Sequence, residues 1–425
     1  MQTENSCFSY TKMSNNFNNM KNSITSLRLR NLCFVAFFAA LLTTCLFSCT
    51  KDDESPTPAP PTPPQGMYIA DTVHYADKGV TAYNIVYTST DPYGQPAMLS
   101  AAIVLGDDIV QSRRSRGFML YNHQSVFRAD ECPTHGSIDM EKKMVGSGLI
   151  TVSADYYGFG VSESQHQAYT MPDANAQASI DALIAAKRLL EWNGYTWDDN
   201  LFVGGYSQGG QTVMGVVKLV AEHYPDIHIT YALAGAGPYD LPATYNNMVQ
   251  TDTSSQPSTV VEVMLAHNQY YNLGIQNSEM FQEPLLSHID DWVLSKQWRR
   301  VQIDSMMGVA TLSQFLTPAM MDLNSDLSRR MLSALDHSNL CQGWTPRGTE
   351  QIMLFHNTSD LTVPPVNTEH MSQFLQQHGV EAELYVNDYG ASAAADGHTV
   401  GAVYFALIAV NKIAAILEIQ PWSIL

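Results

Sequence analysis

The residues with the clearest chemical potential in this sequence are Gly205-Tyr206-Ser207-Gln208-Gly209, a Gly-x-Ser-x-Gly pentapeptide. A short apolar run at residues 200–204 precedes it, and residues 211–222 have the composition of a helix. A strand, a sharp turn and a helix form the context in which such a serine presents its hydroxyl as a nucleophile. The glycines leave room for a tight turn with a strained backbone at the serine. We expect Ser207 to be a nucleophile; the alternative is an ordinary glycine-rich turn.

A serine hydroxyl needs a base to take its proton and an acid to hold that base. On a mostly parallel sheet, the acid and the histidine can follow the serine in that order along the chain. Asp360 follows a predicted strand at residues 351–355, and His398 lies between the last predicted strand and the last predicted helix. Loops at strand ends are where catalytic residues gather. We therefore expect Ser207, Asp360 and His398 to form a catalytic triad.

Other histidines and aspartates compete for these roles. His123 and His356 also lie at predicted strand ends, but the first precedes the serine and the second lies beside the candidate acid, so both are expected to be structural. Asp388 and Asp396 are the alternative acids. Asp396 is only two residues from the candidate histidine, which places it badly for reaching the far ring nitrogen. The order of the residues along the chain favours Asp360 as the acid.

The elements that must position these residues alternate between strands and helices. Residues 80–88 alternate and are rich in β-branched and aromatic side chains, which predicts a strand. Residues 97–105 predict a second strand, and together the two indicate an antiparallel hairpin. Shorter buried strands and further helices follow, with strands predicted at 117–121, 148–154, 227–233 and 383–386 and helices at 173–192, 367–378 and 401–417, the last of them apolar. This alternation predicts an α/β fold, with a mostly parallel central sheet flanked by helices.

The segment at about residues 240–345 interrupts this alternation. It has no clear strand, it contains eight methionines, and helices are predicted at 290–300 and 327–335. We expect it to form a helical cap inserted between strands of the sheet. Methionine side chains are flexible and polarizable, so such a cap could line an adaptable apolar pocket. For any single methionine, a place in the cap's own core is the simpler interpretation.

The N-terminal region has the pattern of an export signal. Basic residues precede an apolar run at residues 32–47, and the run ends in Leu46-Phe47-Ser48-Cys49. This ending resembles a bacterial lipobox, which implies lipid attachment at Cys49. The following Lys51-Asp52-Asp53-Glu54 resembles the surface-export signal of lipoproteins in Bacteroidetes-like bacteria. The alternative is a membrane-spanning anchor, for which the run is short because about 20 apolar residues are needed.

A proline-rich stretch at residues 55–64 predicts a semi-rigid extended tether. We therefore expect a signal peptide with an N-terminal extension at residues 1–48, a lipidated tether at 49–66, and one globular domain at 67–425. The protein would be exported and held by its lipid at the outer membrane or the cell surface. Cys132 and Cys341 are the cysteines beyond the anchor, and in an exported protein they could form a disulfide.

The composition and the motifs argue against nucleic acids, metals and cofactors as binding partners. The chain has 425 residues, 45% of them hydrophobic, and a formal net charge of −19. A nucleic-acid partner is not expected, because no basic stripe is present to neutralise phosphates. We also expect no metal and no cofactor, because the sequence has neither the cysteine and histidine spacing of a zinc site nor a glycine-rich phosphate-binding loop.

Taken together, several motifs resemble the α/β-hydrolase superfamily. The pentapeptide, the run His-Asn-Thr-Ser-Asp-Leu-Thr-Val-Pro at 356–364 and the late Gly397-His398 carry this resemblance. The segments at 122–125, 155–160 and 237–241 resemble its secretory-lipase and related esterase branch, over roughly residues 80–417.

The resemblance implies a serine esterase that cleaves small-molecule carboxylic esters through an acyl-enzyme, with Ser207, Asp360 and His398 as its triad. It also implies an oxyanion hole made by the backbone N–H groups of Gln208 and Gln124. The secretory-lipase branch commonly has glycine at the position that Gln124 occupies here.

Two other functions compete with ester hydrolysis. A serine peptidase could be built on the same fold, but peptidases that trim peptide ends need charged groups to hold the terminus, and the sequence does not reveal them. A non-catalytic glycan-binding surface lipoprotein is the third interpretation. A binding module has no need of a strained serine, so the triad order favours an enzyme.

Overall fold

The computed structural model describes residues 65–76, 78–391 and 395–421. The predicted signal peptide, Cys49 and nearly all of the predicted tether lie outside these residues.

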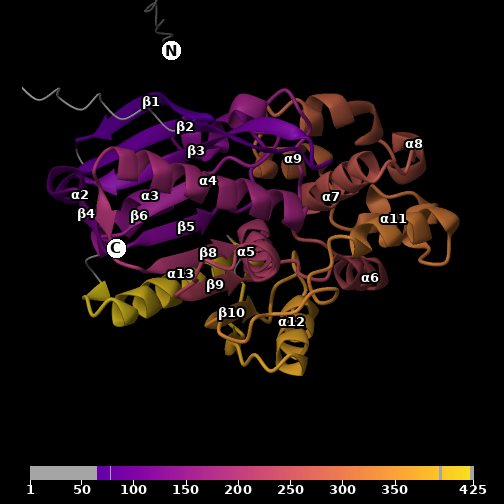
Figure 1. Ribbon diagram of the computed structural model, residues 1–425. Helices are drawn as coiled ribbons and strands as arrows, with labels where there is room; N and C mark the ends of the chain where they lie inside the picture. Colours follow the sequence, from indigo (N-terminus) through magenta and orange to yellow (C-terminus); the bar gives the residue numbers. More distant parts are fainter. Residues whose placement is uncertain (1–64, 77, 392–394, 422–425) are drawn as a thin grey trace, which may run out of the picture. The chain divides into compact units, whose positions relative to one another are not determined.

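A nine-stranded sheet forms the centre of the described chain (Figure 1). Its order is β1 (Met67–Tyr75), β2 (Val80–Thr90), β3 (Pro96–Gly106), β6 (Ile150–Ala154), β5 (Phe118–Asn122), β8 (Leu201–Tyr206), β9 (Tyr231–Gly235), β10 (Ile352–Asn357) and β11 (Glu383–Asn387). The pairs from β1 to β6 are antiparallel and the pairs from β6 to β11 are parallel. A separate two-stranded pair joins β4 (Arg114–Ser115) and β7 (Thr196–Trp197). The predicted fold class is confirmed.

Helices cover both faces of the sheet because the side chains of each strand alternate between its faces. On β5, Leu120 belongs to a core shared with α4 (Pro172–Trp192), α5 (Gln208–His223) and α12 (Val366–Gln377). Its neighbour Met119 belongs to a second core on the other face, shared with α3 (Asp139–Met144) and α13 (Gly397–Ile416). The short α2 (Asp107–Ser112) follows β3. The strands between these layers are almost wholly buried, as expected for parallel strands covered on both sides.

Among the helices of the described residues, only α13 is long and apolar enough to cross a membrane. In this structure its Phe405, Val410 and Ile413 are buried against the sheet. The opposite side of the helix carries exposed apolar residues, including Val403 and Leu407.

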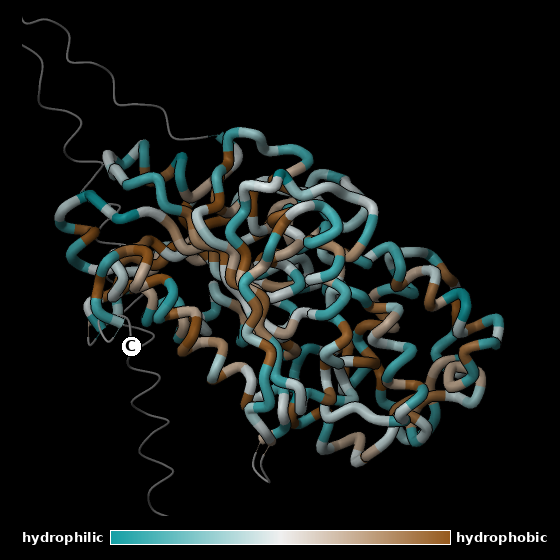
Figure 2. Tube along the Cα trace, turned by 90° about the horizontal axis from the view of Figure 1, so that it is seen from below, coloured by the Kyte–Doolittle hydropathy of each residue, from teal (hydrophilic) through white to brown (hydrophobic). Residues whose placement is uncertain are grey.

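Between β9 and β10 the chain forms a set of helices, which we call the cap (residues 241–336; Figure 1). They are α6 (Leu241–Thr251), α7 (Pro257–Tyr270), α8 (Asn277–Met280), α9 (Arg300–Met307), α10 (Pro318–Met321) and α11 (Asp326–Asp336), joined by loops and shorter helical turns. The cap has its own hydrophobic core. Figure 2 shows hydrophobic and hydrophilic positions interspersed along the chain.

The prediction of one helix over residues 290–300 is wrong. A π-helical turn covers Ile289–Leu294, and α9 begins only at Arg300. Between them Lys296 has a left-handed backbone with φ 55°, which ends the turn. Its buried ammonium donates hydrogen bonds to the carbonyl oxygens of Gly158, Glu163 and Gln165, so a contact distant in sequence decides the local backbone.

Candidate active site

Ser207 lies in the sharp turn between β8 and α5. Its backbone has φ 60° and ψ −124°, the strained conformation expected for this turn. A Cβ atom on Gly209 would lie 2.0 Å from the Asn122 carbonyl oxygen, and one on Gly205 would lie 2.6 Å from the same atom. Both glycines are therefore required, because the end of β5 packs directly against the turn.

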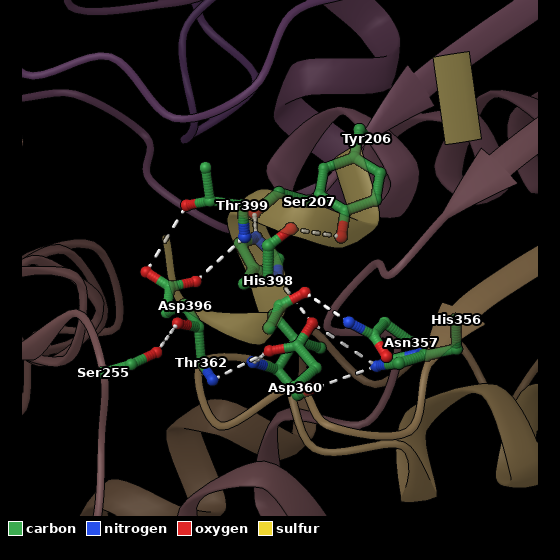
Figure 3. A network of polar contacts seen from close by, with 12 residues as sticks. Tyr206, Ser207, Ser255, His356, Asn357, Asp360, Thr362, Asp396, His398 and Thr399 are labelled. Carbon is green, nitrogen blue, oxygen red and sulfur yellow. Dashed lines mark hydrogen bonds and ion pairs between the residues drawn. The ribbon is translucent and has the colours of Figure 1, made fainter. Parts of the chain in front are cut away.

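The structure brings the three predicted triad residues together (Figure 3). Nε2 of His398 lies 2.8 Å from Oγ of Ser207, and Nδ1 of the same ring lies 2.5 Å from Oδ2 of Asp360. The serine is on the elbow, the aspartate follows β10, and the histidine is the second residue of α13. This is the connectivity of a nucleophile, a base and the acid that orients the base.

The Asp360 carboxylate is buried and well satisfied. Its Oδ1 accepts hydrogen bonds from the backbone N–H groups of Thr362 at 2.8 Å and Val363 at 2.9 Å. Burial by itself would raise the pKa of Asp360, but the interactions with His398 and His356 and the backbone hydrogen bond together lower it below its ordinary value. The carboxylate is thus held in its charged form, which favours an N–H on the facing nitrogen of His398.

The competing histidines have other partners. His356 is fully buried, with Nδ1 2.7 Å from Oγ1 of Thr368 and Nε2 2.8 Å from the carbonyl oxygen of Val363, and burial lowers its pKa. Its Nε2 lies 3.6 Å from Oδ2 of Asp360, so the ring flanks the acid without reaching the serine. His123 contacts the carbonyl oxygen of Gln124 at 2.7 Å and stacks on Tyr156.

The competing aspartates act on the backbone around the site. Asp396 is the N-cap of α13, where its Oδ1 accepts a 2.9 Å hydrogen bond from the N–H of Thr399. It therefore fixes the first turn of the helix that carries His398. Asp388 accepts from the Ser359 hydroxyl at 2.7 Å and from the N–H of Gly390 at 2.8 Å.

The backbone N–H groups of Gln208 and Gln124 have no hydrogen-bond partner in the described part of the chain. The first belongs to the first residue of α5, where the helix supplies no acceptor. Gln124 and Ser207 line the same cavity. The close packing of Asn122 on Gly209 holds these two segments against each other.

The cavity around Ser207 has two arms, and the serine lines both. We call the first the cap arm. It encloses about 600 Å³ of space, part of it open to solvent, between the elbow and apolar cap residues. The cap contributes Leu241, Tyr245, Met248, Val260, Val263, Met264 and Leu335.

The second arm, which we call the outer arm, encloses about 900 Å³ including open solvent. His398 lines the outer arm and does not line the cap arm. The outer arm is lined by both polar and apolar side chains, among them Arg300, Gln256, Ser125, Met140 and Ala402.

The model of a family described as secretory lipase matches residues 137–416. The chain belongs to the secretory lipase family. The matched segment includes the elbow, the cap, Asp360 and His398. No curated protein sequence matches the chain.

Solved structures similar to this secretory lipase family member share its fold. The rice cell wall degrading esterase LipA from Xanthomonas oryzae matches with a TM-score of 0.65 and 19% identity, over 80% of this chain and 89% of that one. The closed state of Candida antarctica lipase A matches with a TM-score of 0.61 and 13% identity, over 83% of this chain and 81% of that one. At these identities the likeness establishes the α/β-hydrolase fold.

Cys132 and Cys341 do not form the disulfide considered from the sequence, because both are free cysteines in the structure. Cys132 is buried in a small cluster with Val126 and Phe159, whereas Cys341 packs on the large core beneath α4 and α5. Burial raises the pKa of the Cys132 thiol to about 12, so it is not a reactive nucleophile. Within the described residues, no group of three or more His, Cys, Asp or Glu is arranged to hold a metal ion.

Sequence reasoning missed several residues around the triad. Tyr206 donates a 2.7 Å hydrogen bond to the carbonyl oxygen of His398, and the Asn357 amide donates at 2.7 Å to that of Gly397. Asn357 ends β10 and was visible as a polar residue at a strand end. Arg300 and Gln256 belong to the cap and carry no sequence motif that points to the cavity.

Proposed function

We propose that this member of the secretory lipase family hydrolyses carboxylic esters with Ser207 as its nucleophile. The observation that carries the proposal is the position of His398, whose ring contacts Oγ of Ser207 at 2.8 Å and Oδ2 of Asp360 at 2.5 Å. A neutral histidine in this place can take the serine proton and later return it. Membership of a lipase family supports an ester as the substrate.

In the first half of the reaction, Oγ of Ser207 attacks the ester carbonyl carbon while Nε2 of His398 accepts its proton. Asp360 stabilises the resulting imidazolium through Nδ1. The carbonyl oxygen becomes an oxyanion, for which the unpaired N–H groups of Gln208 and Gln124 are the proposed donors. When the tetrahedral intermediate collapses, His398 protonates the departing alcohol, and the acyl group stays on the serine.

In the second half, His398 takes a proton from the water that attacks the acyl-enzyme carbonyl. It then gives that proton to Oγ of Ser207 as the bond between Oγ and the acyl carbon breaks, and the carboxylic acid leaves. The strained backbone of Ser207 favours this chemistry because it projects Oγ away from the turn and into the cavity. The apolar cap arm suits the acyl chain, whose burial contributes roughly 0.8 kcal/mol for each CH₂.

Two measurements test the proposal. A fluorophosphonate probe should label the purified protein at Ser207, and the protein should cleave esters faster than the matched anilides. Absence of labelling would contradict the serine mechanism and favour a binding role. Preferential cleavage of anilides or peptides would instead make the protein a serine peptidase.

We also propose an export and anchoring arrangement from the sequence. Residues 1–48 would be removed, Cys49 would carry the lipid on a tether ending near residue 66, and residues 67–425 would form the catalytic domain with its cap at about 240–345. Membership of a secretory family supports export. The predicted place is the outer membrane or the cell surface, and the membrane would be reached through the lipid.

A further inference from the structure

The outer arm is suited to the alcohol part of the ester, if Ser207 and His398 act as proposed above. His398 must reach the departing oxygen to protonate it. The outer arm is lined by His398 and the cap arm is not, so the alcohol leaves on the side of the outer arm. The residues that line the outer arm therefore face the part of the substrate that is released first.

Arg300 is a fixed polar group on the wall of this arm. It is the first residue of α9, and 23% of its side chain is exposed. Its Nη1 donates a 2.6 Å hydrogen bond to Oδ2 of Asp304, one turn along the same helix. The other oxygen of Asp304 accepts the N–H of Ser258 at 2.9 Å. The guanidinium is thus oriented before any substrate binds, which reduces the entropy lost on binding.

An arginine has five N–H donors, and among the described residues the Arg300 guanidinium makes one side-chain hydrogen bond, the one to Asp304. The remaining donors suit oxygen acceptors on a molecule in the arm. Gln256 supplies a second polar group on the same wall and is itself almost fully buried, with its Nε2 3.4 Å from Oδ2 of Asp396. Polar side chains held in this way fix orientation in a site whose other wall is apolar.

The charges around the arm distinguish between kinds of polar alcohol. Asp304 offsets the positive charge of Arg300 at 2.6 Å, and Asp396 adds a carboxylate behind Gln256. An anionic alcohol would therefore meet no net positive charge. The hydroxyl oxygens of a neutral alcohol can accept hydrogen bonds from the remaining N–H groups of Arg300, and a neutral molecule is not repelled by the two carboxylates.

We infer that Arg300 is a specificity-determining residue, which donates hydrogen bonds to a neutral, polyhydroxylated alcohol part of the ester. The matched substrates are three butyrate esters that share one acyl group. Their alcohols are 1-propanol, glycerol esterified at one primary hydroxyl, and 3-hydroxypropanoate. Because the acyl group is constant, ratios of kcat/KM among them report on the outer arm alone.

The wild-type protein should prefer the glycerol ester to both of the others. Arg300→Met should lower the ratio of kcat/KM for the glycerol ester over the propyl ester by on the order of tenfold to hundredfold, since a lost hydrogen bond to a charged group has an effect of this size. Arg299→Met is the matched control. Arg299 is the adjacent arginine, it pairs with Glu131 at 3.3 Å, and it does not line the arm.

A second variant controls for misfolding, because Arg300→Met leaves the Asp304 carboxylate without its positively charged partner. Arg300→Met with Asp304→Asn removes the pair together and should show the same fall in the ratio, with thermal melting recorded for each protein. The inference is overturned if the ratio stays within twofold of wild type in the folded variants, or if the wild-type protein prefers the anionic ester. Failure of Ser207 labelling would instead overturn the proposed function, so the two failures are distinguishable.

Discussion

The Tyr206 hydroxyl donates a 2.7 Å hydrogen bond to the backbone carbonyl oxygen of His398, although the two residues are 192 positions apart. The residue before the candidate nucleophile therefore holds the backbone that carries the candidate base. Their rings also pack together, with centroids 5.0 Å apart. The spacing between Ser207 and His398 is thus maintained by a contact outside the triad.

Tyr206→Phe tests this relationship, because it removes the hydroxyl and keeps the ring. We expect kcat to fall by about tenfold with little change in KM, since a buried carbonyl loses its partner at a cost of about 1–3 kcal/mol and the base loses its support. Steady-state kinetics on one ester measures the effect. Tyr404→Phe, on an exposed tyrosine of α13, the helix that carries His398, should have no effect. An equal fall in both variants would contradict the positioning role.

Ser207→Ala should lower kcat by several orders of magnitude and abolish labelling by a fluorophosphonate, because the members of a triad act as a unit. The melting temperature should stay close to that of the wild type. Ser112→Ala, on an exposed serine that lines neither arm of the cavity, is the control. Esterase activity retained by purified Ser207→Ala would show that another residue is the nucleophile.

Asp360→Asn should reduce kcat by roughly 10³- to 10⁴-fold, because an amide cannot hold the histidine in the required tautomer. It should also change the acid stability. The folded-state pKa of Asp360 is lowered, so its contribution to the free energy of unfolding is present above the ordinary value of 3.8 and is lost as the pH falls through the lower, folded value. Chemical denaturation of both proteins at pH 6 and at pH 3 measures this contribution. A wild-type advantage that does not shrink at pH 3 would contradict it.

The fold and the proposed triad were accessible from sequence because both depend on short-range patterns. The elbow needs glycines beside Ser207, and the loops after β10 and before α13 follow from the alternation of strands and helices. The edge strand β1 was missed because most of its residues are exposed, so it has no buried pattern.

The outer arm could not be predicted, because its walls come from segments that are distant in sequence. Arg300 belongs to a cap helix whose start depends on the turn at Lys296, and that turn depends on carbonyl groups near residue 160. No local pattern encodes such a contact.

Cys49→Ala should release the protein from membranes or block its maturation, because the proposed lipid attachment needs the thiol. Fractionation of expressing cells into membrane and soluble parts measures the change, and Cys132→Ala is the control because that cysteine is buried in the globular domain. Mass spectrometry of the membrane-bound wild-type protein gives the direct test. An unmodified Cys49 in that fraction would rule out the lipid anchor.

Four buried methionines of the cap form two pairs that test the cap arm. Met248 and Met264 line the cap arm, whereas Met307 and Met331 are buried in the cap core and do not line it. Shortening the first pair enlarges the space next to Ser207. Shortening the second pair leaves cavities elsewhere, and it costs about 2–5 kcal/mol of stability for each methionine.

We therefore expect Met248→Ala and Met264→Ala to change the ratio of kcat/KM between butyrate and octanoate esters of one alcohol. The expected change is about tenfold or more, since one methylene is worth about 1–3 kcal/mol of discrimination in an apolar pocket. Met307→Ala and Met331→Ala should lower the melting temperature and leave this ratio as it is in the wild type. If all four variants scale both esters by the same factor, the cap arm does not select the acyl chain, and the acyl group must lie elsewhere.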